Sequence, residues 1–164
     1  HLLRENIVSS TAIRTALKEG KTEEANELLG YTFFFDGRVV EGRKLGRTLG
    51  YPTANLTIED HEKVIPANGV YAVRALLLSN DADLEPLQLL KGMMNIGVRP
   101  TVDGLDKVIE VNLFDFNTVV YGRKLRVFVH KFLRAEIKFA SIDLLKEQLK
   151  ADEIAAKTLL NSMA

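Results

Sequence analysis

The stretch that decides the fold class of this chain is Gly69-Val70-Tyr71-Ala72-Val73-Arg74-Ala75-Leu76-Leu77-Leu78. It is expected to be a strand, because this mainly apolar run is bounded by turn residues. The turn is Ser79-Asn80-Asp81-Ala82-Asp83, and residues 87–98 form the expected return strand, with a bulge at Gly92. The sequence therefore predicts an antiparallel strand pair near the middle of the chain.

Further strands are expected on both sides of this pair. They cover Tyr31–Phe35 with Val39-Val40, residues 108–116 and residues 125–133, and the connections are Asp36-Gly37, Pro100–Asp106 and Tyr121-Gly122. Many short antiparallel strands followed by one amphipathic helix are typical of a small barrel that the helix closes or flanks. The predicted fold is mainly β, a small antiparallel β-barrel.

Alternation along residues 108–116 separates two faces of one expected strand. Ile109, Val111 and Leu113 lie on one face, and Glu110, Asn112 and Phe114 lie on the other. From this pattern alone, Glu110 is most simply an exposed glutamate and Phe114 a core residue.

The two ends of the chain have helical periodicity. Residues 1–30 are expected to form two short helices, capped by Ser9-Ser10-Thr11 and by Thr22 and ended by Gly20 and Gly30. Ser141 is expected to cap a final helix, whose apolar stripe is Ile142, Leu145, Leu149, Ala156 and Leu160. The predicted organisation is a helical appendage over residues 1–30 and one domain over residues 31–164.

Composition excludes several classes of function. The chain of 164 residues has 22 acidic and 22 basic residues and no cysteine. The absence of cysteine excludes disulfides, zinc–thiolate sites and cysteine nucleophiles. Zero net charge argues against a nucleic-acid partner. Because no apolar run approaches the roughly 20 residues of a membrane span and no signal-peptide pattern is present, we expect a cytoplasmic protein with no membrane partner.

A basic, glycine-rich stretch runs from Gly42 to Asn55, Gly-Arg-Lys-Leu-Gly-Arg-Thr-Leu-Gly-Tyr-Pro-Thr-Ala-Asn. Glycine lets the backbone approach a ligand closely, and exposed N–H groups beside arginines bind phosphate oxygens well. Gly42, Arg43, Gly46 and Arg47 are therefore candidate phosphate-binding residues, although the stretch is no Walker loop. Glycine- and arginine-rich loops also commonly do no more than join strands.

The stretch ends in two neutral oxygen donors, Thr53 and Asn55. Pro52 favours extended backbone here, so both side chains are expected to point the same way. Such oxygens suit a hard cation such as Mg²⁺ that also holds substrate phosphates. The alternative is ordinary turn chemistry. The polar segment Leu56–Asn68 that follows is a candidate lid.

Several motifs, in one order from about Tyr31 to the final helix, resemble riboflavin kinase. They are residues 46–55, Gly69-Val70-Tyr71, Asn95-Ile96-Gly97-Val98-Arg99-Pro100-Thr101, Glu110-Val111-Asn112-Leu113-Phe114-Asp115-Phe116, Tyr121-Gly122 and Leu133-Arg134-Ala135-Glu136-Ile137-Lys138-Phe139. The pattern is most similar to the kinase half of the bacterial bifunctional riboflavin kinase/FAD synthetase.

This resemblance implies a reaction and a set of site residues. The γ-phosphoryl group of ATP would pass, with Mg²⁺, to the ribityl 5′-hydroxyl of riboflavin to give FMN and ADP. Glu110 matches the proposed general base, and the family often has histidine where this chain has Asn112. Thr53 and Asn55 would contact Mg²⁺ and phosphate, the glycine-rich loop would contact phosphate, and Arg134, Glu136 and Phe139 would bind the flavin.

The resemblance extends weakly into the first thirty residues. Ser9-Ser10-Thr11-Ala12-Ile13-Arg14 is similar to an element that ends the adenylyltransferase half of those enzymes, which implies a parent protein that also makes FAD. The upstream His-x-Gly-His nucleotide site is not in this chain. A simple helix cap explains the same residues equally well.

Two other functions are considered, both for a non-catalytic barrel. An oligonucleotide-binding module is disfavoured by zero net charge and by only 7% aromatic residues. A flavin carrier is disfavoured because it would not need Thr53, Asn55 and Glu110 together.

Overall fold

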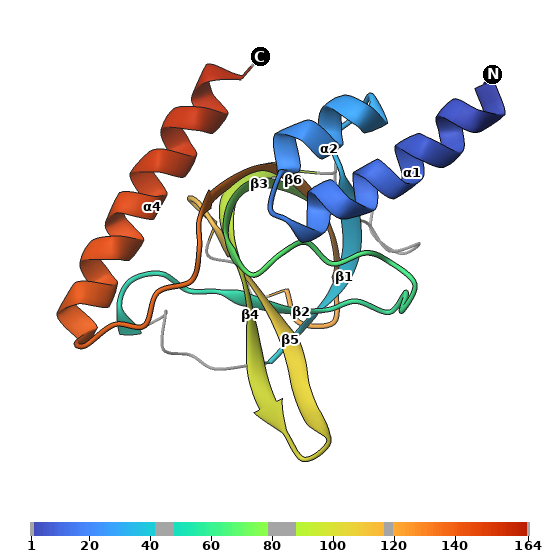
Figure 1. Ribbon diagram of the computed structural model, residues 1–164. Helices are drawn as coiled ribbons and strands as arrows, with labels where there is room; N and C mark the ends of the chain where they lie inside the picture. Colours follow the sequence, from blue (N-terminus) through green and yellow to red (C-terminus); the bar gives the residue numbers. More distant parts are fainter. Residues whose placement is uncertain (1, 42–47, 79–87, 117–119, 164) are drawn as a thin grey trace.

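The computed structural model describes residues 2–41, 48–78, 88–116 and 120–163, with side chains from Ser10 onward (Figure 1). Its elements are α1 (Leu2–Lys18), α2 (Thr22–Leu29), β1 (Phe34–Val40), β2 (Ala54–Thr57), β3 (Gly69–Leu77), β4 (Leu89–Thr101), β5 (Gly104–Leu113), β6 (Lys124–Arg134) and α4 (Ile142–Ser162).

The six strands form a closed antiparallel barrel in the order β1-β2-β5-β4-β3-β6. Alternate residues point inwards, and Tyr71, Met94 and Val111 in the interior are all 0% exposed. Closure of the barrel pairs the backbone N–H and C=O groups that the edge strands of an open sheet would leave unpaired. The prediction of a mainly β fold built on a small barrel is confirmed.

The expected break in the first strand is wrong. β1 runs through Asp36 and Gly37 without interruption. The Asp36 carboxylate accepts hydrogen bonds from Arg126 on β6 at 2.8 and 3.0 Å, so a polar residue fits the outer face. This ion pair holds the pKa of Asp36 below its usual value. A turn sequence can therefore lie inside a strand when its neighbour supplies the partner.

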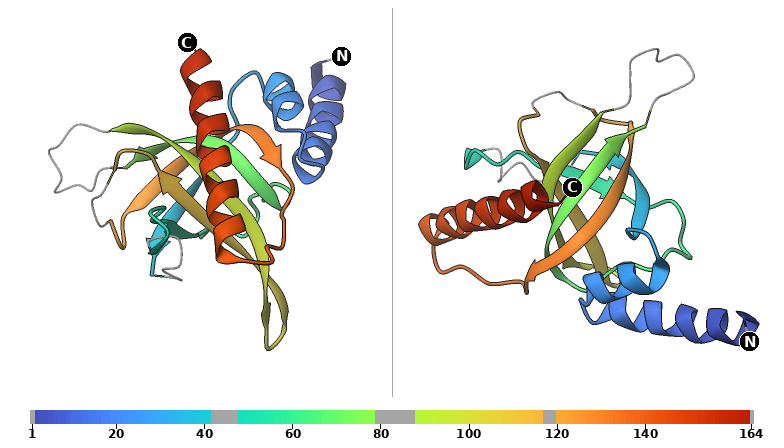
Figure 2. Two further views of the ribbon diagram at one scale, coloured as in Figure 1. Left: turned by 90° about the vertical axis from the view of Figure 1, so that its left-hand side faces the viewer. Right: turned by 90° about the horizontal axis from the view of Figure 1, so that it is seen from above.

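The connection expected at Pro100–Asp106 is mostly strand. β4 and β5 continue through it and pair as far as Thr101 and Gly104, which forms a hairpin that projects beyond the barrel (Figures 1 and 2). The predicted bulge at Gly92 is also wrong, because Gly92 pairs in register with Val73 and Leu113. A Cβ there would lie 2.5 Å from the backbone oxygen of Asn112, so glycine is needed for close approach.

α1 and α2 pack on the barrel rather than standing apart from it. Ala16, Leu17 and Ala25 belong to the same buried cluster as the barrel interior. Asn26 fastens α2 by donating to the carbonyl of Val129 at 2.9 Å and accepting from the Phe33 amide at 2.7 Å. The helices end at Gly20 and Gly30 as predicted, each with a φ of 78°.

The predicted cap at Thr22 is wrong, and so is the one at Ser9-Ser10-Thr11, because α1 begins at Leu2 and runs through these residues. Lys21 is the residue that precedes α2, and no side chain caps the helix there. Thr22 is 1% exposed and lies inside the helix, because its small side chain fills the packed side of the first turn.

α4 lies along the outer face of the barrel and contacts β3, β4 and β6 (Figure 2). Ser141 caps it as predicted, accepting from the Leu144 amide at 3.2 Å. Ala156 and Leu160 are buried with Ala72, Met93 and Phe114 of the barrel. Ile142, expected in the apolar stripe, is instead 60% exposed at the start of the helix. In the described part of the chain, no helix is long and apolar enough to cross a membrane.

Candidate active site

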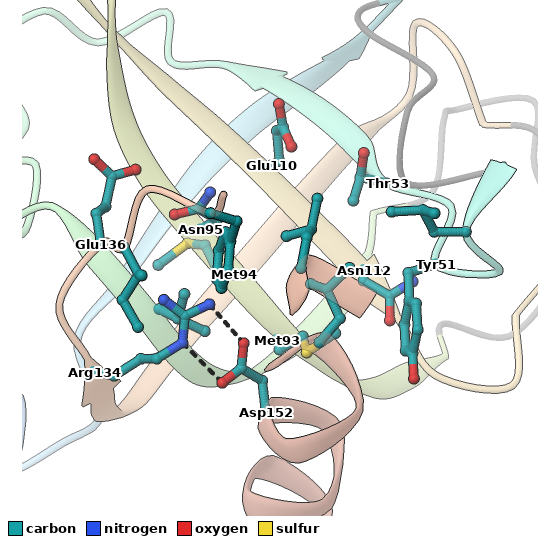
Figure 3. Close-up of a pocket in the computed structure, with 16 residues that line it drawn as sticks. Tyr51, Thr53, Met93, Met94, Asn95, Glu110, Asn112, Arg134, Glu136 and Asp152 are labelled. Carbon is teal, nitrogen blue, oxygen red and sulfur yellow. Dashed lines mark hydrogen bonds and ion pairs between the residues drawn. The ribbon is translucent and has the colours of Figure 1, made fainter. Parts of the chain in front are cut away.

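A pocket of about 250 Å³ lies between α4 and the outer face of the barrel (Figure 3). We call it the α4 pocket. Its walls are the outer faces of β3, β4 and β5, the end of β6 with the chain that follows, the segment Leu49–Thr53 and the first half of α4. Its lining residues are Leu49, Tyr51, Thr53, Val70, Met93, Met94, Asn95, Glu110, Asn112, Arg134, Glu136, Ile137, Phe139, Leu145, Leu149 and Asp152.

The strand register brings several of the expected site residues into one row. Asn55 pairs with Glu110, Glu110 with Asn95, Asn95 with Val70, and Val70 with Arg134. Paired residues on neighbouring strands point to the same face of a sheet. The candidate base therefore lies directly beside one candidate metal ligand, and Arg134 lies three strands away on the same surface.

A second hollow of about 240 Å³ borders the first. We call it the hairpin pocket, lined by Asn55, Asn95, Gly97, Val98, Arg99, Pro100, Val108, Glu110 and Glu136. Asn95, Glu110 and Glu136 line both pockets. Thr53 lines the α4 pocket and Asn55 lines the hairpin pocket. Half-buried Glu110 thus stands where the two pockets meet.

The two ends of the α4 pocket differ in character. The close-up shows Glu110 and Thr53 at one end, with their side-chain oxygens pointing the same way, and Arg134 with Asp152 at the other end (Figure 3). Met93 is buried and lies in the apolar cluster between the barrel and α4. The pocket is therefore oxygen-rich at one end and mainly apolar along its length.

Arg134 is held by α4. Its Nε donates to Oδ1 of Asp152 at 2.9 Å and its Nη2 donates to Oδ2 at 2.7 Å. The Asp152 carboxylate also accepts from Gln148 at 2.9 Å. The guanidinium lies 5.9 Å from the ring centre of Phe139. Arg134, one of the residues expected to bind flavin, therefore also joins β6 to α4.

Glu136 and Phe139, the other two residues that the resemblance assigns to the flavin, both line the α4 pocket. Glu136 is exposed and its carboxylate lies against Gly97 on β4, where a Cβ would overlap it. Phe114, which the sequence predicted to be a core residue, is buried under α4, and Tyr71 is buried in the barrel interior.

Asn112 is 7% exposed, on the same strand and the same face as Glu110. Its side-chain amide donates to the carbonyl of Pro52 at 2.6 Å. The neighbouring Tyr51 donates its hydroxyl to Glu153 of α4 at 3.3 Å, and burial raises the pKa of Tyr51. The segment before β2 is thus attached to β5 and to α4.

The expected phosphate-binding residues Gly42, Arg43, Gly46 and Arg47 lie outside the described residues. Among the described residues, no three His, Cys, Asp or Glu side chains group as a metal site. The expected site residues that the structure describes are therefore Thr53, Asn55, Glu110, Arg134, Glu136 and Phe139.

The segment proposed as a lid lies elsewhere. None of residues 56–68 lines either pocket. Leu56 and Thr57 are part of β2, the Ala67 amide donates to Leu17 of α1 at 3.0 Å, and the Pro66 carbonyl accepts from Lys107 at 3.0 Å. These contacts attach the segment to α1 and β5, and they give the lid hypothesis no support.

Sequence reasoning gave no role to Asn95, Arg99 or Asp152. For Asp152 a signal was present. It stands at helical spacing between Leu149 and Ala156, on the apolar stripe of α4. A carboxylate at a stripe position predicts a buried partner, because an unpaired charge is too costly there.

Comparison with known proteins agrees with this architecture. The family model for riboflavin kinase, named Flavokinase, matches residues 29–160. The bifunctional riboflavin kinase/FMN adenylyltransferase of Haemophilus influenzae is 46% identical over 94% of this chain and 47% of its own length. The protein of the same name from Bacillus subtilis is 42% identical over 89% of this chain and 44% of its own length. The chain spans about half the length of these relatives.

Two solved structures are similar. A crystal structure described as a macrolide-efflux protein from Streptococcus pneumoniae has a TM-score of 0.81 and 40% identity over 90% of this chain and 46% of that one. Riboflavin kinase from Trypanosoma brucei has a TM-score of 0.57 and 21% identity over 79% of this chain and 78% of that one, which shows a shared fold. With a family model that covers most of its residues, this chain belongs to the riboflavin kinase family.

Proposed function

We propose that this chain transfers the γ-phosphoryl group of ATP to the ribityl 5′-hydroxyl of riboflavin, giving FMN and ADP. The observation that carries the proposal is the position of Glu110 where the α4 pocket and the hairpin pocket meet. Phosphoryl transfer chiefly needs two substrates in line, charge neutralisation and a base near the attacking hydroxyl. One pocket for each substrate with a carboxylate between them supplies that arrangement.

In this proposal the 5′-oxygen of the ribityl chain bonds to the γ-phosphorus while Glu110 accepts the proton of that hydroxyl. ADP leaves with the electrons of the broken P–O bond. The neighbouring Asn55 and Thr53 supply neutral oxygens for Mg²⁺. Two protein oxygens fit this ion, which usually keeps waters and shares substrate phosphates. When bound, Mg²⁺ would neutralise phosphate charge. Gly42, Arg43, Gly46 and Arg47 remain proposed phosphate contacts, and Arg99 in the hairpin pocket is a further candidate cation.

The flavin ring is assigned to the α4 pocket. Flat aromatic ligands need apolar walls and a few polar groups that fix their orientation. Met93, Leu149 and Phe139 offer such walls, while Arg134 and Glu136 offer polar atoms at the rim. The ribityl chain would then run towards Glu110.

The chain's wider context is also a proposal. The relatives carry two activities in their names, and this chain spans about half of their length. We infer that residues 31–164 act as a kinase domain that works fused to an adenylyltransferase domain, with residues 1–30 as the end of that domain or a linker, in the cytoplasm. The parent protein would then convert FMN to FAD.

The test incubates the chain with riboflavin, ATP and Mg²⁺ and separates riboflavin, FMN and FAD by chromatography. FMN without FAD is expected. 5′-Deoxyriboflavin, which lacks the attacked hydroxyl, serves as the matched substrate control and should stay unmodified. Tight riboflavin binding without FMN formation would favour a non-catalytic flavin carrier, and binding of neither substrate would defeat the proposal.

A further inference from the structure

The backbone pairing of β2 with β5 includes one proposed metal ligand, Asn55, but not the other, Thr53. β2 pairs with β5 through Ala54 with Val111, Asn55 with Glu110, and Leu56 with Ile109. Before Ala54 the backbone ladder ends, and Pro52 has no N–H to extend it. The side chain of Asn112 reaches the Pro52 carbonyl at 2.6 Å and takes over the attachment. A side-chain bond thus holds the segment that carries Thr53.

Asn112 is well placed to fix this segment accurately. It is 7% exposed and pairs with the buried Met93 on β4, so packing leaves its amide little freedom. It is two residues from Glu110 on one strand, and both side chains point to the same face. β5, which carries the candidate base Glu110, therefore also fixes the peptide before Thr53. The distance between the Glu110 carboxylate and the Thr53 hydroxyl thus depends on the hydrogen bond from Asn112 to Pro52.

A second side-chain contact of this segment is weaker. Tyr51 reaches Glu153 on α4 at 3.3 Å, against 2.6 Å for Asn112 and Pro52. The Pro52 carbonyl is only half-buried, but a carbonyl shielded from water still loses free energy when its donor is removed. Removal of the Asn112 donor should therefore displace the segment rather than leave it in position.

We propose that Asn112 is a positioning residue: its amide holds the Pro52 carbonyl and so sets the Thr53 hydroxyl beside Glu110 for Mg²⁺ and nucleotide phosphate. This inference rests on the proposed kinase function. It predicts that loss of the donor weakens Mg²⁺–nucleotide binding much more than flavin binding, because Met93, Leu149 and Phe139, the walls assigned to the flavin ring, lie outside the segment that Asn112 holds.

The test uses Asn112→Asp, which keeps the shape without the donor, and Asn112→Leu, which removes the donor without adding charge. Asn161→Asp is the control, since it makes the same chemical change at an exposed residue whose side-chain oxygen still accepts from Lys91. ADP with Mg²⁺ is titrated calorimetrically and riboflavin by its fluorescence. Both Asn112 variants should bind ADP with Mg²⁺ about tenfold more weakly and riboflavin within about threefold of wild type.

A double-mutant cycle separates positioning from general loosening. In a Thr53→Val background, Asn112→Leu should no longer weaken the binding of ADP with Mg²⁺, because the hydroxyl that it positions is gone. An effect that persists undiminished, an equal loss of riboflavin affinity, or two Asn112 variants that fail to fold would each overturn the positioning role. A wild-type chain that makes no FMN would instead defeat the proposed function.

Discussion

Arg134 at the end of β6 and Asp152 in α4 form an ion pair with two hydrogen bonds, of 2.9 and 2.7 Å, at the edge of the α4 pocket. The Asp152 side chain is only 4% exposed. The pair therefore joins the barrel to α4, the helix that forms one side of the pocket. Arg134, which is expected to bind flavin, thus also stabilises the packing of α4 on the barrel.

Asp152→Ala should destabilise the protein markedly. Removal of the buried Asp152 carboxylate leaves the half-buried Arg134 guanidinium without its counter-ion and Gln148 without its acceptor, which typically costs about 3–5 kcal/mol. The free energy of unfolding from urea titrations measures this. Glu23→Ala, which removes an exposed ion pair with Lys131, is the control and should cost less than about 1 kcal/mol. Equal losses in the two variants would contradict a buried, stabilising junction.

His130 should make stability depend on pH. It is 8% exposed, and its Nε2 lies 3.3 Å from Nη1 of Arg74. Nη2 of the same arginine donates to the carbonyl of Leu160 in α4 at 3.0 Å. Burial, with the Arg74 charge, lowers the pKa of His130 from 6.5 to about 4. The unfolded chain binds this proton between those pH values and the folded chain does not. His130 therefore stabilises the fold fully above pH 6.5, and up to about 3 kcal/mol is lost as pH falls to 4.

Urea titrations between pH 7 and pH 4 check this prediction. His130→Gln should show a shallower loss of stability than wild type over that range, since its side chain cannot take up the proton. The exposed His61→Gln should follow wild type. A His130→Gln curve parallel to wild type would show that another group causes the acid sensitivity.

Two glycines on β4 should respond differently to alanine. A Cβ at Gly92 meets the backbone oxygen of Asn112, which cannot move without distorting β5. A Cβ at Gly97 meets the end of the Glu136 side chain, which is exposed and can turn away. Gly92→Ala should therefore lower the melting temperature by several degrees. Gly97→Ala should change the melting temperature little. It should instead alter the Michaelis constants for riboflavin and ATP, because Glu136 borders both pockets. The reverse order of melting temperatures would contradict this geometry.

Asn95 stands beside Glu110 on the neighbouring strand and lines both pockets, so we expect it to contact the ribityl chain. Asn95→Ala should weaken riboflavin binding about tenfold, the usual scale for one lost hydrogen bond. Lumiflavin, which has the ring without the ribityl chain, should bind both proteins equally. Equal weakening for both flavins would place Asn95 against the ring instead.

The sequence predicted the barrel better than it predicted the connections between strands. Alternating apolar positions and the caps at Gly20, Gly30 and Ser141 depend on local chemistry, which a sequence displays. The continuity of β1 through Asp36 depends on Arg126, 90 residues away along the chain. That partner is visible only once the strands are paired.

The role of Arg134 shows the same limit within the site. Its motif indicated a ligand-binding arginine, but the pairing with Asp152 depends on how α4 docks on the barrel. The meeting of two pockets at Glu110 likewise follows from the pairing of β5 with β4 on one side and, on the other, with β2, which lies far earlier in the chain. Local pattern selected the residues, and the barrel register arranged them.

The measurement that tests the central claim most directly compares wild type with Glu110→Gln in FMN formation and in riboflavin binding. Glu147→Gln, at an exposed position on α4, is the control for the same chemical change. If Glu110 takes the hydroxyl proton, the variant should lose about 10²- to 10⁴-fold in kcat while its riboflavin Kd stays within about threefold of wild type. FMN formation by Glu110→Gln at the wild-type rate would contradict the assignment of Glu110 as the base between the two pockets.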